Sequence, residues 1–312
     1  MKNLNALMTE RVEKLTAVAA QLRRDVVNAV YYAKDGHPGP CMSAADLMAV
    51  LYFDLLRLNP ADPAWPDRDR FILSKGHACP LWYAALARRG YFPPVELKTL
   101  RALGSRLQGH PDLKKTPGVD ANSGSLGHGL SQACGMALAA RKRGSDSLNV
   151  VITGDGELNE GIVWEAAMAI AKLKLTNVIA IVDNNGMQSG GKVEQVSGLY
   201  PLREKWEAFG WYVVEVDGHD ISQFLPVLER AFIRGRATRE ERQGMSLLPE
   251  HMELDLASAG VPHPDQPVVL IARTLKGKGV PYMEGDNSWH KRVPTDEEHQ
   301  IALSILGGQD LE

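Results

Sequence analysis

Two short runs of β-branched residues, separated by a helix-like pattern, stand out in the middle of the chain. The first run, at 150–152, is Val-Val-Ile and stops at a Gly-Asp-Gly turn at 154–156. Apolar residues then recur at helical spacing over 163–175, and a second β-branched run follows at 178–182. Short apolar runs bounded by turn residues are typical of buried strands. The pattern predicts a strand, a helix and a second strand, which together form a βαβ unit.

The rest of the chain alternates in the same way between helix-like and strand-like segments. Residues 4–33 carry helical periodicity and predict one or two helices before the first strand. Further helices are expected at 43–56, 81–89, 95–103, 202–209 and 221–233, and further strands at 70–74, 211–216 and 267–273. This order predicts an α/β fold, a mostly parallel sheet with helices on both faces. We expect a single domain over 1–312, with a helical segment at about 1–35.

Length and composition place the chain among globular proteins. It has 312 residues, of which 44% are hydrophobic and 23% are charged, enough for one large α/β domain or two small ones. The formal net charge of −3 at pH 7 provides no basic field for a nucleic acid or an anionic membrane. Neither is therefore expected as a partner, and any anion must be bound locally.

The cysteines and the amino terminus bear on the compartment. Cys41, Cys79 and Cys134 are odd in number and lack the spacing of a metal site, which fits thiols in a reducing cytoplasm. Residues 1–15 lack the apolar core of a signal peptide, and no apolar stretch reaches the length of a membrane span. The expected location is the cytoplasm.

Side chains with oxygen ligands follow both strands of the central unit. Asp155 comes directly after the first strand, and Asp183, Asn184 and Asn185 follow the second. Parallel strands bring their carboxyl ends to the same edge of a sheet, where open α/β proteins bind ligands. Carboxylate and carboxamide oxygens suit Mg²⁺, which commonly keeps phosphate oxygens in its remaining positions. The sequence therefore predicts a magnesium-bound diphosphate at this edge.

The central unit resembles the signature of thiamine-diphosphate enzymes, with Gly-Asp-Gly, a following Glu-Gly, and an asparagine 30 positions after the aspartate. The stretch GDGELNEGIVWEAAMAIAKLKLTNVIAIVDNN is similar in particular to the transketolase version. The resemblance implies the thiamine-diphosphate-binding fold, thiamine diphosphate as cofactor, and Mg²⁺, which Ca²⁺ or Mn²⁺ could replace. It assigns the metal to Asp155, Asn185 and the Met187 carbonyl, and it adds Gly154 and Gly156 to the cofactor site.

Four histidines stand in motifs that resemble transketolase elements. Gly-His-Pro occurs at His37 and again at His110, His77 follows a strand in DRFILSKGHA, and His290 follows a tryptophan after TLKGKGV. The resemblance implies catalytic roles near the substrate for His37 and His110, and contacts to the cofactor diphosphate for His77 and His290. From the residues alone, turn chemistry accounts for His37, and a buried structural imidazole accounts for His77. The neighbouring Lys276 is expected to be solvated.

A glycine-rich stretch at 122–129, NSGSLGHG, is similar to the family's TGxLGxG loop. Because the backbone of that loop lies against the cofactor, the resemblance implies cofactor contacts at Gly124 and Leu126. Ser123 replaces the usual Thr and His128 the usual Gln, which leaves the loop's polar contacts open. The glycine order does not fit a dinucleotide-binding loop, and the Gly-Lys pairs lack the Ser or Thr of a P-loop.

Glu160 and Glu165 occupy transketolase positions shortly after the Gly-Asp-Gly turn. On one helix, residues five apart are separated by about 140° and do not share a face. The resemblance implies catalytic roles for both, with Glu160 also at the cofactor site and facing the partner subunit in a carboxylate relay. An ordinary surface glutamate is the alternative for each.

The resemblance covers nearly all 312 residues but only the diphosphate-binding portion of a transketolase. It implies ketol transfer between sugar phosphates, carried out only with a carboxyl-terminal partner subunit that provides the pyrimidine-binding domain, in an α2β2 assembly. A 2-oxo-acid dehydrogenase component, a deoxyxylulose-phosphate synthase and a non-catalytic regulatory subunit are the alternatives. Relative to the family, residues from about 234 to 266 form an insertion, expected to be a solvated excursion rather than a binding patch, with a subunit contact also open.

Overall fold

The computed structural model describes residues 2–249, 258, 260–308 and 311, and side chains from residue 6 onward. The chain divides into two compact units. The helical unit comprises Met1–Ala64, Gly76–Gly124 and Thr274–Glu312, and the sheet unit comprises Trp65–Lys75 and Ser125–Arg273. The single domain expected over 1–312 stays a prediction.

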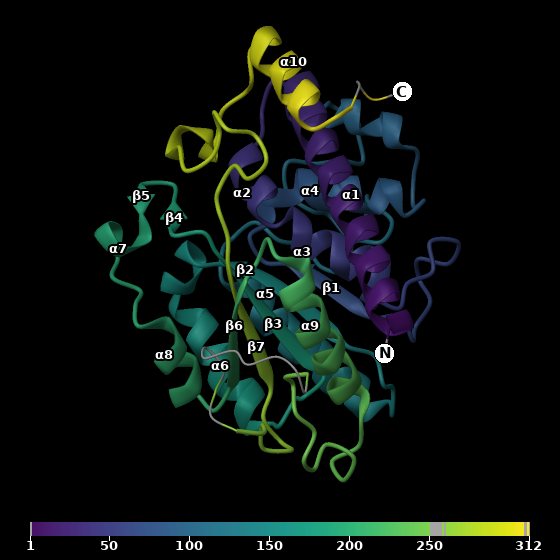
Figure 1. Ribbon diagram of the computed structural model, residues 1–312, viewed down its shortest axis with the longest axis vertical. Coiled ribbons are helices and arrows are strands. Elements are labelled where there is room, and N and C mark those ends of the chain that lie inside the picture. The colour runs from purple at the N-terminus through teal and green to yellow at the C-terminus, as the bar shows by residue number, and fades with distance from the viewer. Residues whose placement is uncertain (1, 250–257, 259, 309–310, 312) are drawn as a thin grey trace. The chain divides into compact units, whose positions relative to one another are not determined.

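The sheet unit contains a five-stranded, entirely parallel sheet in the order β1-β2-β3-β7-β6 (Figure 1). Its strands are β1 (Arg70–Leu73), β2 (Asn149–Gly154), β3 (Val178–Asn184), β6 (Tyr212–Asp217) and β7 (Val268–Arg273). Val150, Val151 and Ile152 of β2 are fully buried. Strands covered on both faces carry continuous apolar runs rather than alternating ones, which explains the pattern in the sequence.

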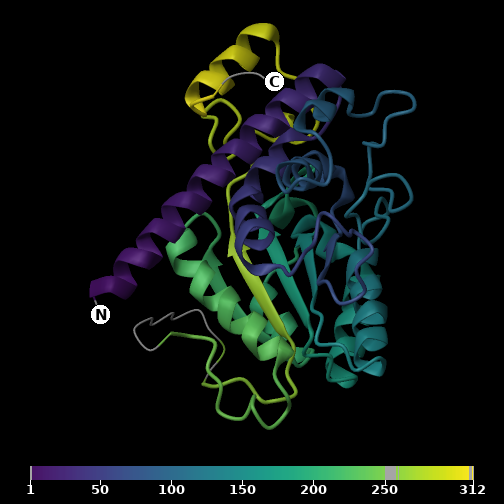
Figure 2. The same ribbon diagram turned by 90° about the vertical axis from the view of Figure 1, so that its right-hand side faces the viewer.

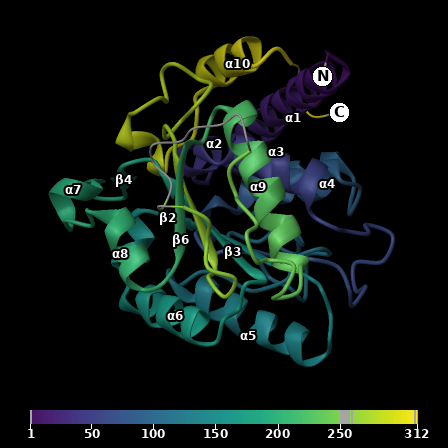
Figure 3. The same ribbon diagram turned by 60° about the horizontal axis from the view of Figure 1, so that its bottom comes forward.

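Helices cover both faces of this sheet. α5 and α6 lie on one face and α9 on the other (Figure 3). The helices of the unit are α5 (His128–Lys142), α6 (Gly161–Lys172), α7 (Val193–Val196), α8 (Leu202–Ala208) and α9 (Ile221–Arg236). A hairpin of β4 (Met187–Gln188) and β5 (Gly191–Lys192) follows β3. The predicted α/β fold is confirmed.

The helical unit is built around α1 (Lys2–Ala33), which runs as one helix (Figure 2). The other helices are α2 (Pro38–Ser43), α3 (Ala45–Val50), which continues as a π-helix at Leu51–Leu55, α4 (Cys79–Arg88) and α10 (Asp296–Ile305). α10 packs on α1 through His299, whose ring stacks on Tyr31 with centroids 3.9 Å apart. The helix expected at 95–103 is instead a 3₁₀ helix at Pro94–Thr99, and Arg101, with φ of 63°, lies outside the helical region.

The described part of the region predicted as an insertion is partly exposed and partly packed. Residues 239–241, 243 and 244 are exposed, and the solvated excursion stays a prediction. α9 continues to Arg236, so the connection to β7 begins at Ala237. Leu247 is fully buried, and Arg242 donates hydrogen bonds to the carbonyls of Ala237 and Pro264. Residues 250–257 and 259 of the predicted insertion lie outside the described residues.

The structure also describes the cysteines and the helices that were considered as possible membrane spans. Cys41, Cys79 and Cys134 are free thiols, and the first two are buried. Across the described ranges, no helix combines the length and the apolar character needed to cross a bilayer.

Candidate functional site

The carboxyl ends of β2 and β3 lie side by side in the sheet unit. Gly154 and Asp183 are paired in register, so the turns that follow both strands emerge at one edge of the sheet. Asp155 joins these turns. Its Oδ1 accepts a hydrogen bond from the backbone N–H of Gly156, and its Oδ2 accepts one from that of Gly186. The structure thus brings Asp155 against the turn that contains Asn185.

The charge of Asp155 is not balanced locally. Its side chain is buried, with 1% of the residue exposed. Burial, and then the neighbouring carboxylate of Asp183, raise the pKa of Asp155 to about 7. Asp183 forms a buried ion pair with Lys75, whereas Asp155 has no ion pair within the described part of the chain. A bound divalent cation would supply the missing positive charge, so this carboxylate fits a metal ligand.

The other two predicted ligands also lie in this turn. Asn185 accepts a hydrogen bond from the backbone N–H of Met187 through Oδ1, at 3.0 Å, and donates to Asp183 through Nδ2, at 3.3 Å. An amide oxygen has two lone pairs, so Oδ1 keeps one for a cation. No three His, Cys, Asp or Glu side chains of the described residues form a metal cluster. A cation here would therefore depend on a carboxylate, a carboxamide and a backbone carbonyl, the oxygen donors that Mg²⁺ prefers.

Two glycines allow the loops around this edge to approach each other. A Cβ on Gly156 would lie 2.6 Å from the Cβ of Gln188, and a Cβ on Gly127, which has φ of 84°, would lie 2.7 Å from Cγ2 of Ile162. Gly154 has more room, because its Cβ would be 3.6 Å from the side chain of Lys75. Of these three glycines, Gly156 and Gly127 leave no room for a Cβ, whereas Gly154 does.

A buried carboxylate that the sequence analysis missed connects the glycine-rich loop to the Gly-Asp-Gly turn. Glu157 is 3% exposed. Its Oε1 accepts hydrogen bonds from Ser74 Oγ and from the N–H of Gly127, at 2.7 Å, and its Oε2 accepts one from the N–H of Gly154, at 3.0 Å. Burial raises the pKa of Glu157, and these hydrogen bonds oppose the shift. The one signal in the sequence is its position directly after the turn.

Three of the four predicted histidines form a cluster in the helical unit. The ring centroids of His37 and His77 are 5.2 Å apart, those of His37 and His290 5.5 Å, and those of His77 and His290 5.2 Å. Nδ1 of His37 is buried and has no hydrogen-bond partner among the described residues. Since buried polar atoms are normally paired, this nitrogen fits a position that a bound molecule completes.

His37 and His110 are both held in the neutral form. Burial, followed by the positive charges of Lys291 and Arg101, lowers the pKa of His37 to about 4. Burial and then Arg101 also lower the pKa of His110. The ring of His110 lies 3.9 Å from where a Cβ on Gly124 would stand, so it borders the glycine-rich loop. A neutral imidazole has one donor and one acceptor nitrogen, as proton transfer requires.

Lys276 was expected to be solvated, and this expectation is wrong. The residue is 1% exposed, and its Nζ lies 2.8 Å from Oδ1 of Asn287 and 2.9 Å from Nδ1 of His290. Its segment is held against the chain by a hydrogen bond from the N–H of Gly277 to the carbonyl of Gly39. Because an ammonium group only donates, Nδ1 of His290 accepts, and the ring proton is placed on Nε2. In this tautomer, the Nε2–H group of His290 is a donor of the kind that an anionic oxygen accepts.

The remaining predicted residues lie outside these clusters. Glu160 does not share a helix with Glu165, as the sequence analysis supposed, because it precedes α6 with extended backbone angles, φ −73° and ψ 122°. Both glutamates are exposed, Leu126 is half-buried and Gly124 is exposed.

Residues 14–241 match the family described as transketolase, thiamine diphosphate binding domain. This match spans more than half of the 312 residues, and the chain therefore belongs to this family.

Relatives in the family include proteins of about the same length that are themselves transketolase subunits. The chain is 38% identical over 293 residues to an apulose-4-phosphate transketolase subunit of Phocaeicola vulgatus, covering 94% of each chain. It is 36% identical over 299 residues to the 6-deoxy-6-sulfo-D-fructose transketolase subunit SqwG of a Clostridium species, covering 96% of this chain and 98% of that protein. The prediction of a diphosphate-binding transketolase subunit is thus confirmed.

Longer relatives match in part. The chain is 37% identical over 300 residues to transketolase of Homo sapiens, with 95% of this chain but 42% of the human protein covered. The solved structure of transketolase from Leishmania mexicana superposes with a TM-score of 0.80 at 30% identity, covering 96% of this chain and 42% of that one. The fold of the diphosphate-binding portion is therefore shared with complete transketolases.

Proposed function

We propose that the chain, together with a carboxyl-terminal partner that carries the pyrimidine-binding domain, transfers a two-carbon ketol unit from a ketose phosphate to an aldose phosphate. Two copies of each subunit would form an α2β2 assembly. The observation that carries the proposal is the buried carboxylate of Asp155, which lacks an ion pair among the described residues and lies against the turn of Asn185. The relatives named as transketolase subunits support the requirement for a partner.

The residues of the sheet edge would hold the cofactor through its metal. When bound, thiamine diphosphate supplies a nucleophilic carbon and an electron sink for the cleavage of a carbon–carbon bond. Asp155, Asn185 and the Met187 carbonyl would bind Mg²⁺, or Ca²⁺ or Mn²⁺ in its place. The backbone around Gly154 and Gly156, with that of Gly124 and Leu126, would lie against the cofactor.

The histidines would divide the remaining tasks. His77 and His290 would donate hydrogen bonds to diphosphate oxygens, and the contact of Lys276 with Nδ1 of His290 places the ring proton of His290 on Nε2. His37 and His110 would orient the ketose oxygens and move protons at them. The lowered pKa of each keeps both rings neutral at pH 7, so that each ring can accept a proton and donate one.

The exposed glutamates and the compartment complete the proposal. Glu160 and Glu165 are available at the surface for contact with a partner, and Glu160 would take part in a carboxylate relay. Three cysteines without a disulfide support a reducing, cytoplasmic location.

Reconstitution from the two purified proteins tests the proposal. We expect ketol transfer from a pentose phosphate only when this chain, the carboxyl-terminal partner, thiamine diphosphate and Mg²⁺ are all present. Asp155→Asn should abolish cofactor binding, measured by calorimetry with the partner present, and His110→Gln should lower kcat. The matched control is His219→Gln, because His219 lies in the turn after β6 of the sheet unit and has no proposed role at the site. Full transfer by this chain alone, or unchanged cofactor affinity in Asp155→Asn, would contradict the proposal.

A further inference from the structure

A cavity of about 360 Å³ lies in the sheet unit at the amino ends of the strands, opposite to the edge that carries Asp155. Ser145 and Asp146, which precede β2, and Thr176 and Asn177, which precede β3, line it. Pockets for small molecules measure roughly 300–1,000 Å³. β3 has seven residues and so separates the two edges by about 20 Å, at ~3.3 Å per residue. A ligand in this cavity would therefore not touch the cofactor site.

Basic side chains predominate around the cavity. The lining contains four cations and two carboxylates: Arg141, Lys174, Arg236, Arg242, Asp146 and Asp265. Arg236 forms an ion pair of 2.7 Å with Asp69, and Lys174 forms one of 2.8 Å with Asp265. The hydrogen bond from Lys174 is the largest cause of the lowered pKa of Asp265, which shows that this carboxylate is already engaged. These two cations are therefore balanced by protein groups.

Arg141 and Arg242 are not balanced in this way. Nη1 of Arg141 donates to the carbonyl of Leu173 at 2.6 Å, and Nε of Arg242 donates to the carbonyl of Pro264 at 2.7 Å. Neither guanidinium has an ion pair with a described carboxylate. Burial lowers the pKa of Arg242, and the more distant carboxylate of Asp265 opposes this shift. The carbonyls fix each guanidinium group and leave other N–H donors unused. Both thus keep a full charge for an incoming anion.

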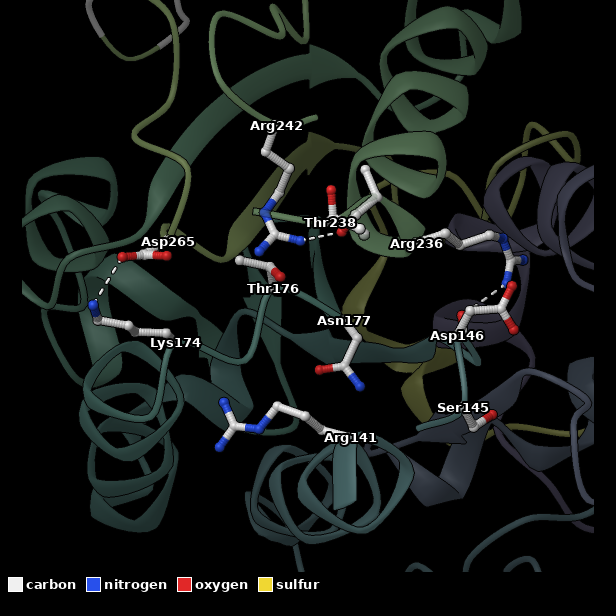
Figure 4. A pocket seen from close by; sticks show the side chains of 12 residues that line it. Arg141, Ser145, Asp146, Lys174, Thr176, Asn177, Arg236, Thr238, Arg242 and Asp265 are labelled. Atoms are coloured by element: carbon white, nitrogen blue, oxygen red, sulfur yellow. Dashed lines mark hydrogen bonds and ion pairs between the residues drawn. The ribbon is translucent and has the colours of Figure 1, made fainter. Parts of the chain in front are cut away.

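The arrangement of these donors suits a tetrahedral dianion. Figure 4 shows Arg141 and Arg242 entering from opposite sides of the cavity, with Thr176 and Asn177 between them. Thr238 adds a hydroxyl group from the segment after α9. Guanidinium groups favour phosphate, with which they form charge-assisted hydrogen bonds of fixed geometry. Arg141 and Arg242 have no ion pair of their own among the described residues, so both guanidinium groups can pair with a phosphate monoester even though the carboxylate of Asp146 also lines the cavity.

We propose that this cavity binds a small phosphate monoester, such as a sugar phosphate, at a site separate from the cofactor and the reacting sugars. The predicted insertion supplies part of it, because Thr238, Arg242 and Asp265 all follow α9. The volume is sufficient for a phosphoryl group and a short carbon chain. This proposal goes beyond ketol transfer and does not depend on it.

Binding of ribose 5-phosphate, inorganic phosphate and ribose to the full chain, measured by titration calorimetry with thiamine diphosphate and Mg²⁺ present, tests the proposal. We expect the ester to bind and ribose not to bind. Arg141→Gln should raise the Kd of the ester about tenfold, because it removes one charge-assisted hydrogen bond. Arg141 is an exposed residue of α5, so its replacement should leave the fold intact. Lys142→Gln is the matched control, since Lys142 is the adjacent exposed cation of α5 and does not line the cavity.

Each outcome of these titrations either supports the proposal or overturns it. Equal affinity for inorganic phosphate would support it and assign recognition to the phosphoryl group alone. An equal Kd for wild type, Arg141→Gln and Arg242→Gln would overturn it, because phosphate would then be held elsewhere. Tighter binding of citrate than of the ester, with the same dependence on Arg141, would also overturn it by identifying a carboxylate site.

Discussion

Replacing Glu157 by glutamine tests whether this buried carboxylate holds the glycine-rich loop against the Gly-Asp-Gly turn. The carboxylate accepts three hydrogen bonds, from Ser74, Gly127 and Gly154. Glutamine has the same shape but one acceptor oxygen, and its NH₂ group can only donate. At least one of the three donors must then face another donor in a site that is 3% exposed.

The expected loss of stability in Glu157→Gln follows from these contacts. A hydrogen bond to a charged group contributes about 1.5–3 kcal/mol, and a buried donor left unpaired costs about 1–3 kcal/mol. Since part of this loss can be relieved by small shifts, we expect the free energy of unfolding of Glu157→Gln to fall by about 2–4 kcal/mol. At roughly 2–4 °C per kcal/mol, the Tm should fall by about 4–16 °C.

Urea unfolding followed by circular dichroism measures this change. The matched control is Glu165→Gln, because Glu165 is an exposed glutamate of α6 and should change stability by no more than about 0.5 kcal/mol. Thiamine diphosphate affinity, measured with the partner present, should also fall in Glu157→Gln, because one carboxamide oxygen cannot hold both the N–H of Gly127 and the N–H of Gly154. A stability loss for Glu157→Gln no larger than that of the control would refute the reasoning.

Two other predictions concern buried charge and pH. Lys75→Met should lower the free energy of unfolding by about 3–5 kcal/mol, because it leaves the carboxylate of Asp183 buried without its ion pair. The control is Lys278→Met, because Lys278 forms an exposed ion pair of 3.9 Å with Glu284, and it should lower the free energy of unfolding by less than about 1 kcal/mol. If chemical denaturation shows equal losses for the two variants, burial of the Lys75 pair does not determine its effect on stability. The pKa of His37 is lowered from 6.5 to about 4 in the folded chain. Between these pH values the unfolded chain binds a proton at His37 that the folded chain does not bind. The free energy of unfolding therefore decreases as the pH falls from 6.5 to 4. His37→Gln should therefore reduce the acid sensitivity between pH 6.5 and 4, and an NMR titration of His37 in the folded chain with a pKa near 6.5 would rule this out.

The scaffold could be predicted because its determinants are local. The β-branched runs of β2 and β3 identify strands with both faces covered, and the helical spacing between them identifies α6. Two parallel neighbours must end at one edge, so the approach of Asp155 to the turn of Asn185 follows from topology alone. The clustering of His37, His77 and His290 does not follow in this way, since it depends on segments far apart in the chain.

Burial of individual charges was decided only by the tertiary structure. Glu157 and Lys276 each look like solvated surface residues in the sequence, yet both are nearly inaccessible. Lys75 meets Asp183 across 108 positions, a pairing that no local pattern encodes. The cavity likewise combines α5 with the segment after α9. Periodicity determines which face of a helix or strand is apolar, because it reports on neighbours three or four residues away. Whether a charge is desolvated, and by what it is balanced, depends on which distant segments pack over it.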